Sequence, residues 1–265
     1  PTRGVPTFAV REPVLRLKPG SVVETKTFSK PGDYYEPDKA GPWPGEVGPF
    51  FIEGASPGDT LLVKVVRLRP NRDVAISNVT PGGISGVAGD SRTRLLNEPL
   101  PARRFVWRLD RVRNVGIIDL PNSAVKRMEI PLRPMLGRVA VAPAGEEVFG
   151  GLWPGDFGGN MDASDVTEGA TVHLPVFHEG GLFYFGDFHA AQGDGEITGS
   201  GLESTADVTF QFDVIKGRRI RWPRIENADH IMVAASVRPL IDALRIAEAA
   251  FVVNNCAAAV LLALA

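Results

Sequence analysis

Short runs of β-branched and aromatic residues dominate the chain, and glycine or proline separates them roughly every eight to twelve residues. This spacing is typical of an all-β sandwich or barrel, because turn residues recur between short strands. The run from Thr60 to Leu68 alternates in part, which indicates a strand with one buried face. The predicted strands are Val14–Leu17, Ser21–Thr27, Gly48–Glu53, Thr60–Arg69, Arg104–Leu109, Val115–Asp119, Val125–Ile130, Gly137–Val141, Thr171–Phe177, Gly181–Asp187, Asp207–Ile215 and His230–Ser236.

The pattern changes near the carboxyl end. Between Pro239 and Ala250, apolar residues recur at roughly helical spacing, with proline close to the first turn. Alanine and leucine dominate the run from Cys256 to Ala265, and no polar residue interrupts it, so we expect the helix to continue there as a buried segment. The expected fold is therefore mainly β with a C-terminal helix.

Two domains are one interpretation of this organisation. The first would be an N-terminal β domain over residues 1–135. The second, residues 136–265, would be a C-terminal β-rich domain that carries a polar segment and the terminal helix. A single interwoven unit remains an open alternative, since no linker of distinct composition separates the two parts.

Composition narrows the classes of partner. The 29 Lys and Arg nearly balance the 31 Asp and Glu, and the basic residues are scattered, which argues against a nucleic-acid partner. The single cysteine, Cys256, excludes an internal disulfide framework and a multi-thiolate zinc site. The sequence contains no run of 18 apolar residues, so it predicts no membrane span. The first residue is Pro1, which fits either a trimmed chain or a mature exported one, so a cytoplasmic and a periplasmic location both stay open.

The segment from Gly158 to Glu203 holds polar residues of the kinds that bind metals or transfer protons. Asp187 and His189 follow an aromatic strand two residues apart, so an extended backbone would point both to one side. Asp194 and Glu196 repeat that spacing after a run of small residues that permits a tight return. We expect these four side chains to converge. One imidazole with several carboxylates suits a divalent ion, zinc or calcium, and a metal-bound water would make hydrolysis the natural reaction.

Each of these residues also has a purely structural interpretation. A single histidine such as His189 is more often hydrogen bonded than metal bound, and Asp194 with its following glycine is a common turn. Asn160 and Asp162 follow two glycines that would let the backbone approach a ligand, although a glycine turn with an Asx cap explains them equally well. The dense clustering favours function. His173 and His178 flank a strand, and we expect neither to be a ligand.

Four stretches carry a resemblance to a known family. They are FIEGASPGDTLLVKV at Phe51–Val65, RPMLGRVAVAP at Arg133–Pro143, GGNMD at Gly158–Asp162 and LPVFHEGGLFYFGDFHAAQGDGEITGSGLE at Leu174–Glu203. Together they resemble the acetamidase/formamidase family. The resemblance implies a mainly β fold of sandwich and barrel-like parts with a smaller α/β portion. It also implies a homodimer or higher homo-oligomer, a divalent metal, and hydrolysis of small amides to carboxylate and ammonia.

The resemblance also implies roles for individual residues. The metal and its water would lie among four side chains, Asp162, Asp187, His189 and Glu196. The catalytic set would be Glu196, Asp187, Asn160 and Gln192. Within that set Glu196 would transfer the proton, and Asn160 or Gln192 would polarise the amide carbonyl, since attack on it builds negative charge.

The chain also departs from the family pattern. No histidine occurs between Pro1 and Leu17, where a His-Asn-x-Trp-like motif would be expected, and Gly155–Phe157 stands where another histidine would precede GGNMD. These departures leave a second function open, a non-catalytic β-rich module that binds calcium and a ligand through the same carboxylates.

Overall fold

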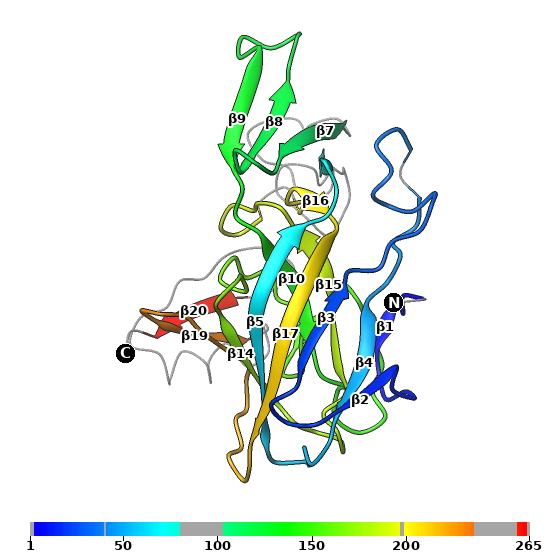
Figure 1. Cartoon of the computed structure of the whole chain (residues 1–265), viewed down its shortest axis with the longest axis vertical. Coiled ribbons are helices and arrows are strands. Elements are labelled where there is room, and N and C mark those ends of the chain that lie inside the picture. The colour runs from blue at the N-terminus through cyan, green and yellow to red at the C-terminus, as the bar shows by residue number, and fades with distance from the viewer. Residues whose placement is uncertain (1–2, 40, 80–102, 197–198, 236–258, 264–265) are drawn as a thin grey trace, which may run out of the picture.

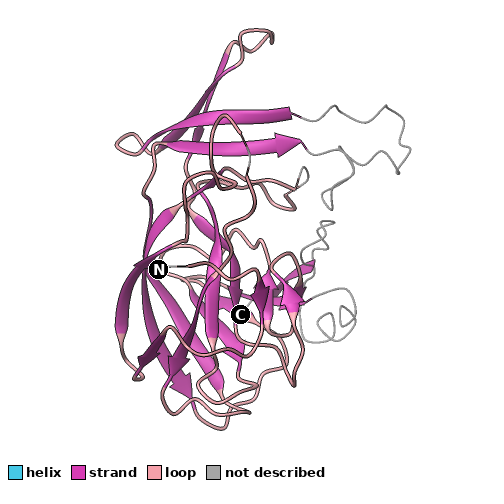
Figure 2. Cartoon of the chain, turned by 90° about the vertical axis from the view of Figure 1, so that its right-hand side faces the viewer, coloured by secondary structure: helices cyan, strands magenta, loops and turns pink. Residues whose placement is uncertain are grey.

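The computed structural model describes residues 3–39, 41–79, 103–196, 199–235 and 259–263. In these ranges the chain consists of strands and loops, as Figure 2 shows, and the predicted mainly β class is confirmed. None of the described segments forms a helix, so the smaller α/β portion has no counterpart among them, and nothing there has the length and apolarity of a membrane-crossing helix.

The larger sheet has eleven strands. The order along its main path is β12 (Pro154–Gly155), β13 (Gly158–Asn160), β10 (Met135–Ala140), β15 (Phe183–His189), β16 (Glu203–Ser204), β6 (Val74–Val79), β7 (Arg103–Asp110), β8 (Val115–Asp119) and β9 (Arg127–Pro131). Off this path, β4 (Val47–Ile52) pairs with β15, and β2 (Leu15–Leu17) runs parallel to β4. The hairpin of β8 and β9 projects away from the rest of the molecule (Figure 1).

The smaller sheet has seven strands. Their order is β20 (Ala259–Ala263), β19 (Ile231–Ala235), β18 (Arg224–Glu226), β14 (Thr171–Pro175), β5 (Thr60–Pro70), β17 (Ala206–Ile215) and β3 (Val22–Lys26). A separate two-stranded sheet pairs β1 (Thr7–Phe8) with β11 (Phe149–Gly150).

The hydrophobic core lies between the two large sheets. Buried and exposed residues alternate along β17, as expected for a strand with one buried face. Its inward-facing Phe210 and Phe212 contact Phe183 and Phe185 of β15, with ring centroids 4.8 Å apart for Phe185 and Phe210. Burying one such ring contributes ~1.5–3 kcal/mol, so this aromatic layer holds the sheets together as a sandwich. Figure 1 shows β5, β17 and β3 in front of β10 and β15.

Both sheets combine strands from either side of residue 135. The larger sheet places β4 and β6 to β9 beside β10, β15 and β16, while the smaller places β3 and β5 beside β14 and β17. The two parts of the chain therefore share both sheets in the described structure.

All twelve predicted strands are present, with ends that differ by at most two residues. The predicted helix from Pro239 to Ala250 lies outside the described residues. The helical prediction for Cys256 to Ala265 is wrong over Ala259–Ala263, which form β20 and pair antiparallel with β19. An uninterrupted apolar run carries no periodicity that separates helix from strand, and the open edge of β19 supplies hydrogen-bonding partners that favour the strand.

Candidate active site

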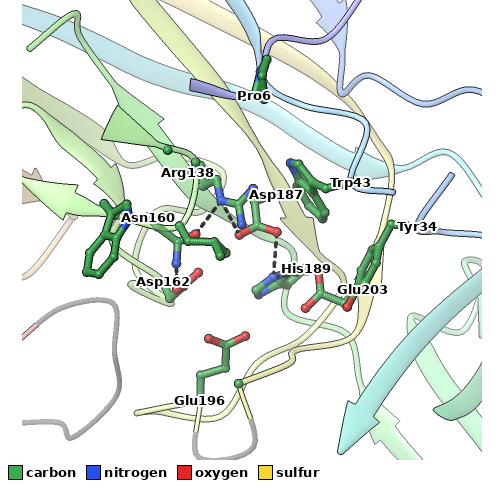
Figure 3. A pocket seen from close by; sticks show the side chains of 15 residues that line it. Pro6, Tyr34, Trp43, Arg138, Asn160, Asp162, Asp187, His189, Glu196 and Glu203 are labelled. Carbon is green, nitrogen blue, oxygen red and sulfur yellow. Dashed lines mark hydrogen bonds and ion pairs between the residues drawn. The ribbon is translucent and has the colours of Figure 1, made fainter. Parts of the chain in front are cut away.

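One pocket, with a volume of about 490 Å³, collects most of the predicted site residues (Figure 3). Its ionisable side chains come from several strands and loops between Tyr34 and Glu203. Asp187 and His189 lie on β15, Arg138 on the neighbouring β10 and Glu203 on β16, while Asp162 and Glu196 lie in loops. Tyr34 and Trp43 come from the loop between β3 and β4.

Three carboxylates of this pocket have an unusual backbone. The φ angles of Asp162, Asp187 and Glu196 are 45°, 55° and 38°, in the left-handed region that non-glycine residues rarely adopt. Such a conformation costs on the order of 1–3 kcal/mol at each residue and persists only where surrounding contacts hold it. All seven residues of β15 are buried, and Asp187 alone among them has a left-handed backbone. Strain of this kind concentrates at functional sites.

Two glycines make room for the polar side chains. A Cβ atom on Gly137 would lie 2.5 Å from Asp162 Oδ1 and 2.7 Å from Asp187 Oδ2. A Cβ atom on Gly201 would lie 2.6 Å from His189 Nδ1. Any larger residue at these positions would displace the side chains of Asp162, Asp187 and His189, which lie at the floor of the pocket.

A hydrogen-bonded chain fixes the imidazole of His189. The amide nitrogen of Gln192 donates to the carbonyl of Asp162 at 2.7 Å, which turns its oxygen toward His189 Nδ1, also at 2.7 Å. Nδ1 must therefore carry a proton and donate it, because that oxygen can only accept. The other nitrogen, Nε2, lies 3.1 Å from Glu203 Oε2 and 3.4 Å from Asp187 Oδ1. Burial lowers the pKa of His189, but the charges of Glu203 and Asp187 outweigh it and raise the pKa well above its usual value.

A buried guanidinium organises the opposite wall. Arg138 donates from Nη1 to Glu46 at 2.8 Å and from Nε to Asn160 Oδ1 at 2.6 Å, and Nε is 3.3 Å from Asp187 Oδ2. The amide nitrogen of Asn160 in turn donates to Asp162 Oδ2 at 2.7 Å. The guanidinium also lies 4.3 Å from the ring centre of Trp43, at cation–π distance. One cation thereby positions an amide and two carboxylates.

Several carboxylates lie close together at the pocket floor. Burial, together with the charges of Glu196 and Asp187, raises the pKa of Asp162 well above its usual value. Burial first, and then the charges of Glu203 and Asp187, raise the pKa of Glu196 to about 7. Asp187 differs, because Arg138 and His189 outweigh the effect of burial and lower its pKa. At the floor, Asp162 and Glu196 therefore resist ionisation, whereas the neighbouring Asp187 stays charged.

Two overlapping groups of donor atoms at the floor lie close enough together to hold a divalent ion. Asp162, His189 and Glu196 offer ligand atoms within 4.8 Å of one another, and so do Asp187, His189 and Glu203. Asp162 Oδ1 is buried and makes no hydrogen bond within the described part of the chain. Two ligands about 2.1 Å from one ion at a tetrahedral angle lie about 3.4 Å apart, close to the separations of His189 Nε2 from Asp187 and Glu203.

Tyr34 presents a hydroxyl group to the same pocket. Its oxygen accepts a hydrogen bond from Asn78 Nδ2 at 2.8 Å, while Asn78 Oδ1 accepts from Arg104 Nη1 at 3.2 Å. Arginine can only donate, so this contact fixes the orientation of the Asn78 amide and leaves the Tyr34 hydrogen available to donate. Burial and the charges of Glu203 and Asp187 raise the pKa of Tyr34, which keeps it protonated.

The structure brings together five of the predicted site residues. These five, Asn160, Asp162, Asp187, His189 and Glu196, all line the pocket. Gln192 lies beside it, with both ends of its amide engaged by His189 and Asp162. The predicted convergence of Asp194 is wrong, because its carboxylate is exposed and accepts a hydrogen bond from Ser164 at 3.0 Å. Asp194 lies in the turn that the hydrogen bond from the Glu196 amide to the Gly193 carbonyl closes, and only Glu196 of that pair reaches the pocket.

Other residues of the pocket were not predicted. His173 and His178 lie elsewhere, bonded to Glu226 and to the carbonyl of Pro143. The unpredicted ionisable residues that line the pocket are Tyr34, Arg138 and Glu203. Glu46 was not predicted either, and it contacts Arg138 without lining the pocket. Arg138 carried a usable signal, since it is the single charged residue in the apolar run from Met135 to Ala142. A lone charge inside a buried strand requires a partner, and that partner is Glu46.

Comparison with known proteins shows the family to which the chain belongs. A model of the acetamidase/formamidase family matches residues 140–239. A solved structure of an acetamidase from Yersinia enterocolitica superposes with a TM-score of 0.75 at 33% sequence identity, covering 92% of this chain and 74% of that one. The chain belongs to the acetamidase/formamidase family.

Two further relatives, which match this chain in sequence, are named as amidases. An acetamidase from Mycolicibacterium smegmatis is 29% identical over 215 residues, and a formamidase from Methylophilus methylotrophus is 27% identical over 213 residues. Each alignment covers 64% of this chain and 53% or 51% of the relative. The chain thus matches about half the length of these two family members.

Proposed function

We propose that this chain hydrolyses the C–N bond of a small primary amide, with Glu196 as the group that moves the proton. The single observation that supports this most directly is the position of the Glu196 carboxylate, in a pocket with a histidine and three further carboxylates and with a pKa of about 7. A carboxylate of that pKa is divided between its two protonation states near neutral pH, so it can both accept and return a proton. Membership of a family with named amidases supports the same reaction.

The proposed reaction proceeds in two steps. Ionised Glu196 takes a proton from water as the water oxygen bonds to the amide carbon, and the carbonyl π electrons move onto oxygen. Protonated Glu196 then delivers that proton to the amide nitrogen, the oxygen electrons re-form the carbonyl, and the C–N bond breaks. The products are a carboxylic acid and ammonia, which exchange a proton to give carboxylate and ammonium.

The negative charge that develops on oxygen needs a donor. The hydroxyl of Tyr34 is oriented by Asn78 so that its hydrogen can donate. Asn160 has a second amide hydrogen besides the one bonded to Asp162. Gln192 instead acts on the imidazole, because its amide oxygen holds His189 Nδ1. We assign carbonyl polarisation to Tyr34 and Asn160, and positioning to Gln192.

A divalent ion fits the donor atoms of the floor. His189, Asp187 and Glu203 would hold it, with Asp162 beside them. When bound, such an ion polarises a carbonyl and lowers the pKa of water. The imidazole in this set favours zinc over calcium, since calcium takes oxygen ligands. The same argument weighs against the alternative function of a calcium-binding module.

The test is ammonia release from formamide, acetamide and propionamide. The protein is assayed as purified, after chelation, and after reconstitution with zinc or with calcium. We expect turnover that zinc restores, and a loss of about 10²–10⁴-fold in Glu196→Gln with zinc binding retained. Exposed Glu146, converted to Gln, serves as the matched control. Turnover by Glu196→Gln equal to that of the unaltered protein would contradict the role of Glu196, and the absence of turnover in every metal state would contradict the amidase proposal.

A further inference from the structure

The pocket has two chemically different ends. Its floor carries the carboxylates and His189 described above, whereas its rim is built by Pro6, Leu152 and Trp153. Leu152 is 50% exposed and Trp153 is 57% exposed, and these two neighbouring apolar side chains both line the pocket. Exposed apolar residues that continue into a polar pocket are typical of a ligand groove.

Backbone contacts hold this rim in place. The amide of Gly151 donates to the carbonyl of Pro6 at 3.1 Å, and the amide of Trp153 donates to Gly150 at 3.1 Å. The carbonyl of Trp153 accepts from the amide of Asn160 at 3.5 Å, next to the pairing of β12 with β13. The rim is therefore tied directly to a residue of the candidate active site.

The size of the pocket exceeds the needs of the smallest amides. Formamide and acetamide have three and four heavy atoms, which occupy on the order of 100 Å³ when each takes about the volume of a water molecule, ~30 Å³. The pocket volume is about 490 Å³. An amide with one or two carbons on the acyl side would contact the floor and leave Leu152 and Trp153 in water.

We propose that the substrate is a primary amide with a bulky, uncharged apolar acyl group, aryl or branched alkyl, which packs against Leu152 and Trp153. This inference rests on the proposed amidase activity and names its substrate class. The apolar group belongs on the acyl side, because a primary amide releases ammonia and leaves only the acyl carbon substituted. A charged acyl group is disfavoured, since the described rim carries no ionisable side chain that would pair with it.

The test compares phenylacetamide with acetamide. We expect kcat/KM for phenylacetamide to be higher by about tenfold or more, because each buried methylene-sized group contributes about 10-fold or more to discrimination. Leu152→Ala and Trp153→Ala should each lower kcat/KM for phenylacetamide about 5-fold to 50-fold more than for acetamide. Val112→Ala removes an apolar side chain that is 98% exposed in a distant turn, so it should change neither value.

The outcomes separate this inference from the proposed function. Turnover of acetamide with no gain for phenylacetamide, or equal losses for both in Leu152→Ala and Trp153→Ala, would overturn the substrate class and leave the amidase proposal standing. If no amide is hydrolysed, the amidase proposal fails, and calorimetric titration still tests the rim. Phenylacetamide should then bind at least tenfold more tightly than acetamide, and Trp153→Ala should abolish that difference. Equal binding of the two amides would overturn the inference as well.

Discussion

Arg138 Nη1 lies 2.8 Å from Glu46 Oε1, and both side chains are almost completely removed from water. The two residues are far apart in the sequence and meet because β15 pairs both with β10, which carries Arg138, and with β4, which Glu46 immediately precedes. Glu46 Oε1 also accepts from the indole of Trp43 at 3.1 Å. The pair is thus the support on which Asn160 and Asp187 are positioned.

Removal of Arg138 should destabilise the protein. Arg138→Ala would leave Glu46 and Asp187 buried without their cation, and breaking a buried pair in this way costs about 3–5 kcal/mol. Urea unfolding followed by circular dichroism measures the free energy of unfolding. The control is Arg113→Ala, which removes an exposed partner of Glu129 and should change little. A similar small effect for Arg138→Ala would show that the buried pair contributes nothing to stability.

Glu46 should make stability depend on pH. Burial raises its pKa to about 7, from about 4.5 in the unfolded chain, even though Arg138 lowers it in part. The folded state therefore binds the proton more tightly, so this contribution is complete below about pH 4.5 and is lost as the pH rises through about 7. Glu46→Gln should make the decline shallower, because the raised pKa values of Asp162, Glu196 and His189 contribute to the rest of it. Parallel unfolding curves at pH 5 and pH 8 for the two proteins measure it, and an identical pH dependence would refute the assignment.

Tyr34 should act in turnover and not in stability. Tyr34→Phe deletes one donor to the developing oxyanion, for which a loss of about 10²–10³-fold in kcat is expected, with a smaller change in KM. Asn78→Ala should reduce kcat to a lesser degree, because it only releases the orientation of the phenol. Steady-state kinetics and thermal melts are the measurements. A rise in KM with kcat unchanged would mean that Tyr34 binds substrate without stabilising the transition state.

Gly137 should tolerate no side chain. In Gly137→Ala the new Cβ would meet the carboxylates of Asp162 and Asp187, so we expect a loss of activity and of metal affinity of at least tenfold. Gly193→Ala is a matched control, since a Cβ there meets no atom within 4 Å and its φ is not left-handed. If both variants retain the same activity and metal affinity, the contact of Gly137 with Asp162 and Asp187 is not needed for function.

Local sequence patterns predicted most of the fold. The twelve strands were predictable because turn residues and β-branched or aromatic runs act over a few neighbouring positions. The shorter strands, such as β13 and β16, were not, because two or three residues carry no periodic signal. The run at Ala259–Ala263 was misassigned because pairing with β19, and not local propensity, decides its conformation.

By itself, the sequence determined the β-rich class, the family and the segment that contains Asn160, Asp162, Asp187, His189 and Glu196, since these lie within one conspicuous stretch. The tertiary structure decided which side chains converge. The pocket includes Glu196, excludes Asp194, and adds Tyr34, Arg138 and Glu203, with Glu46 bound to Arg138. The physical reason is that burial and pairing of charge depend on contacts between distant segments. No spacing along the chain records that Arg138 would meet Glu46, or that Asp187 would adopt a left-handed backbone.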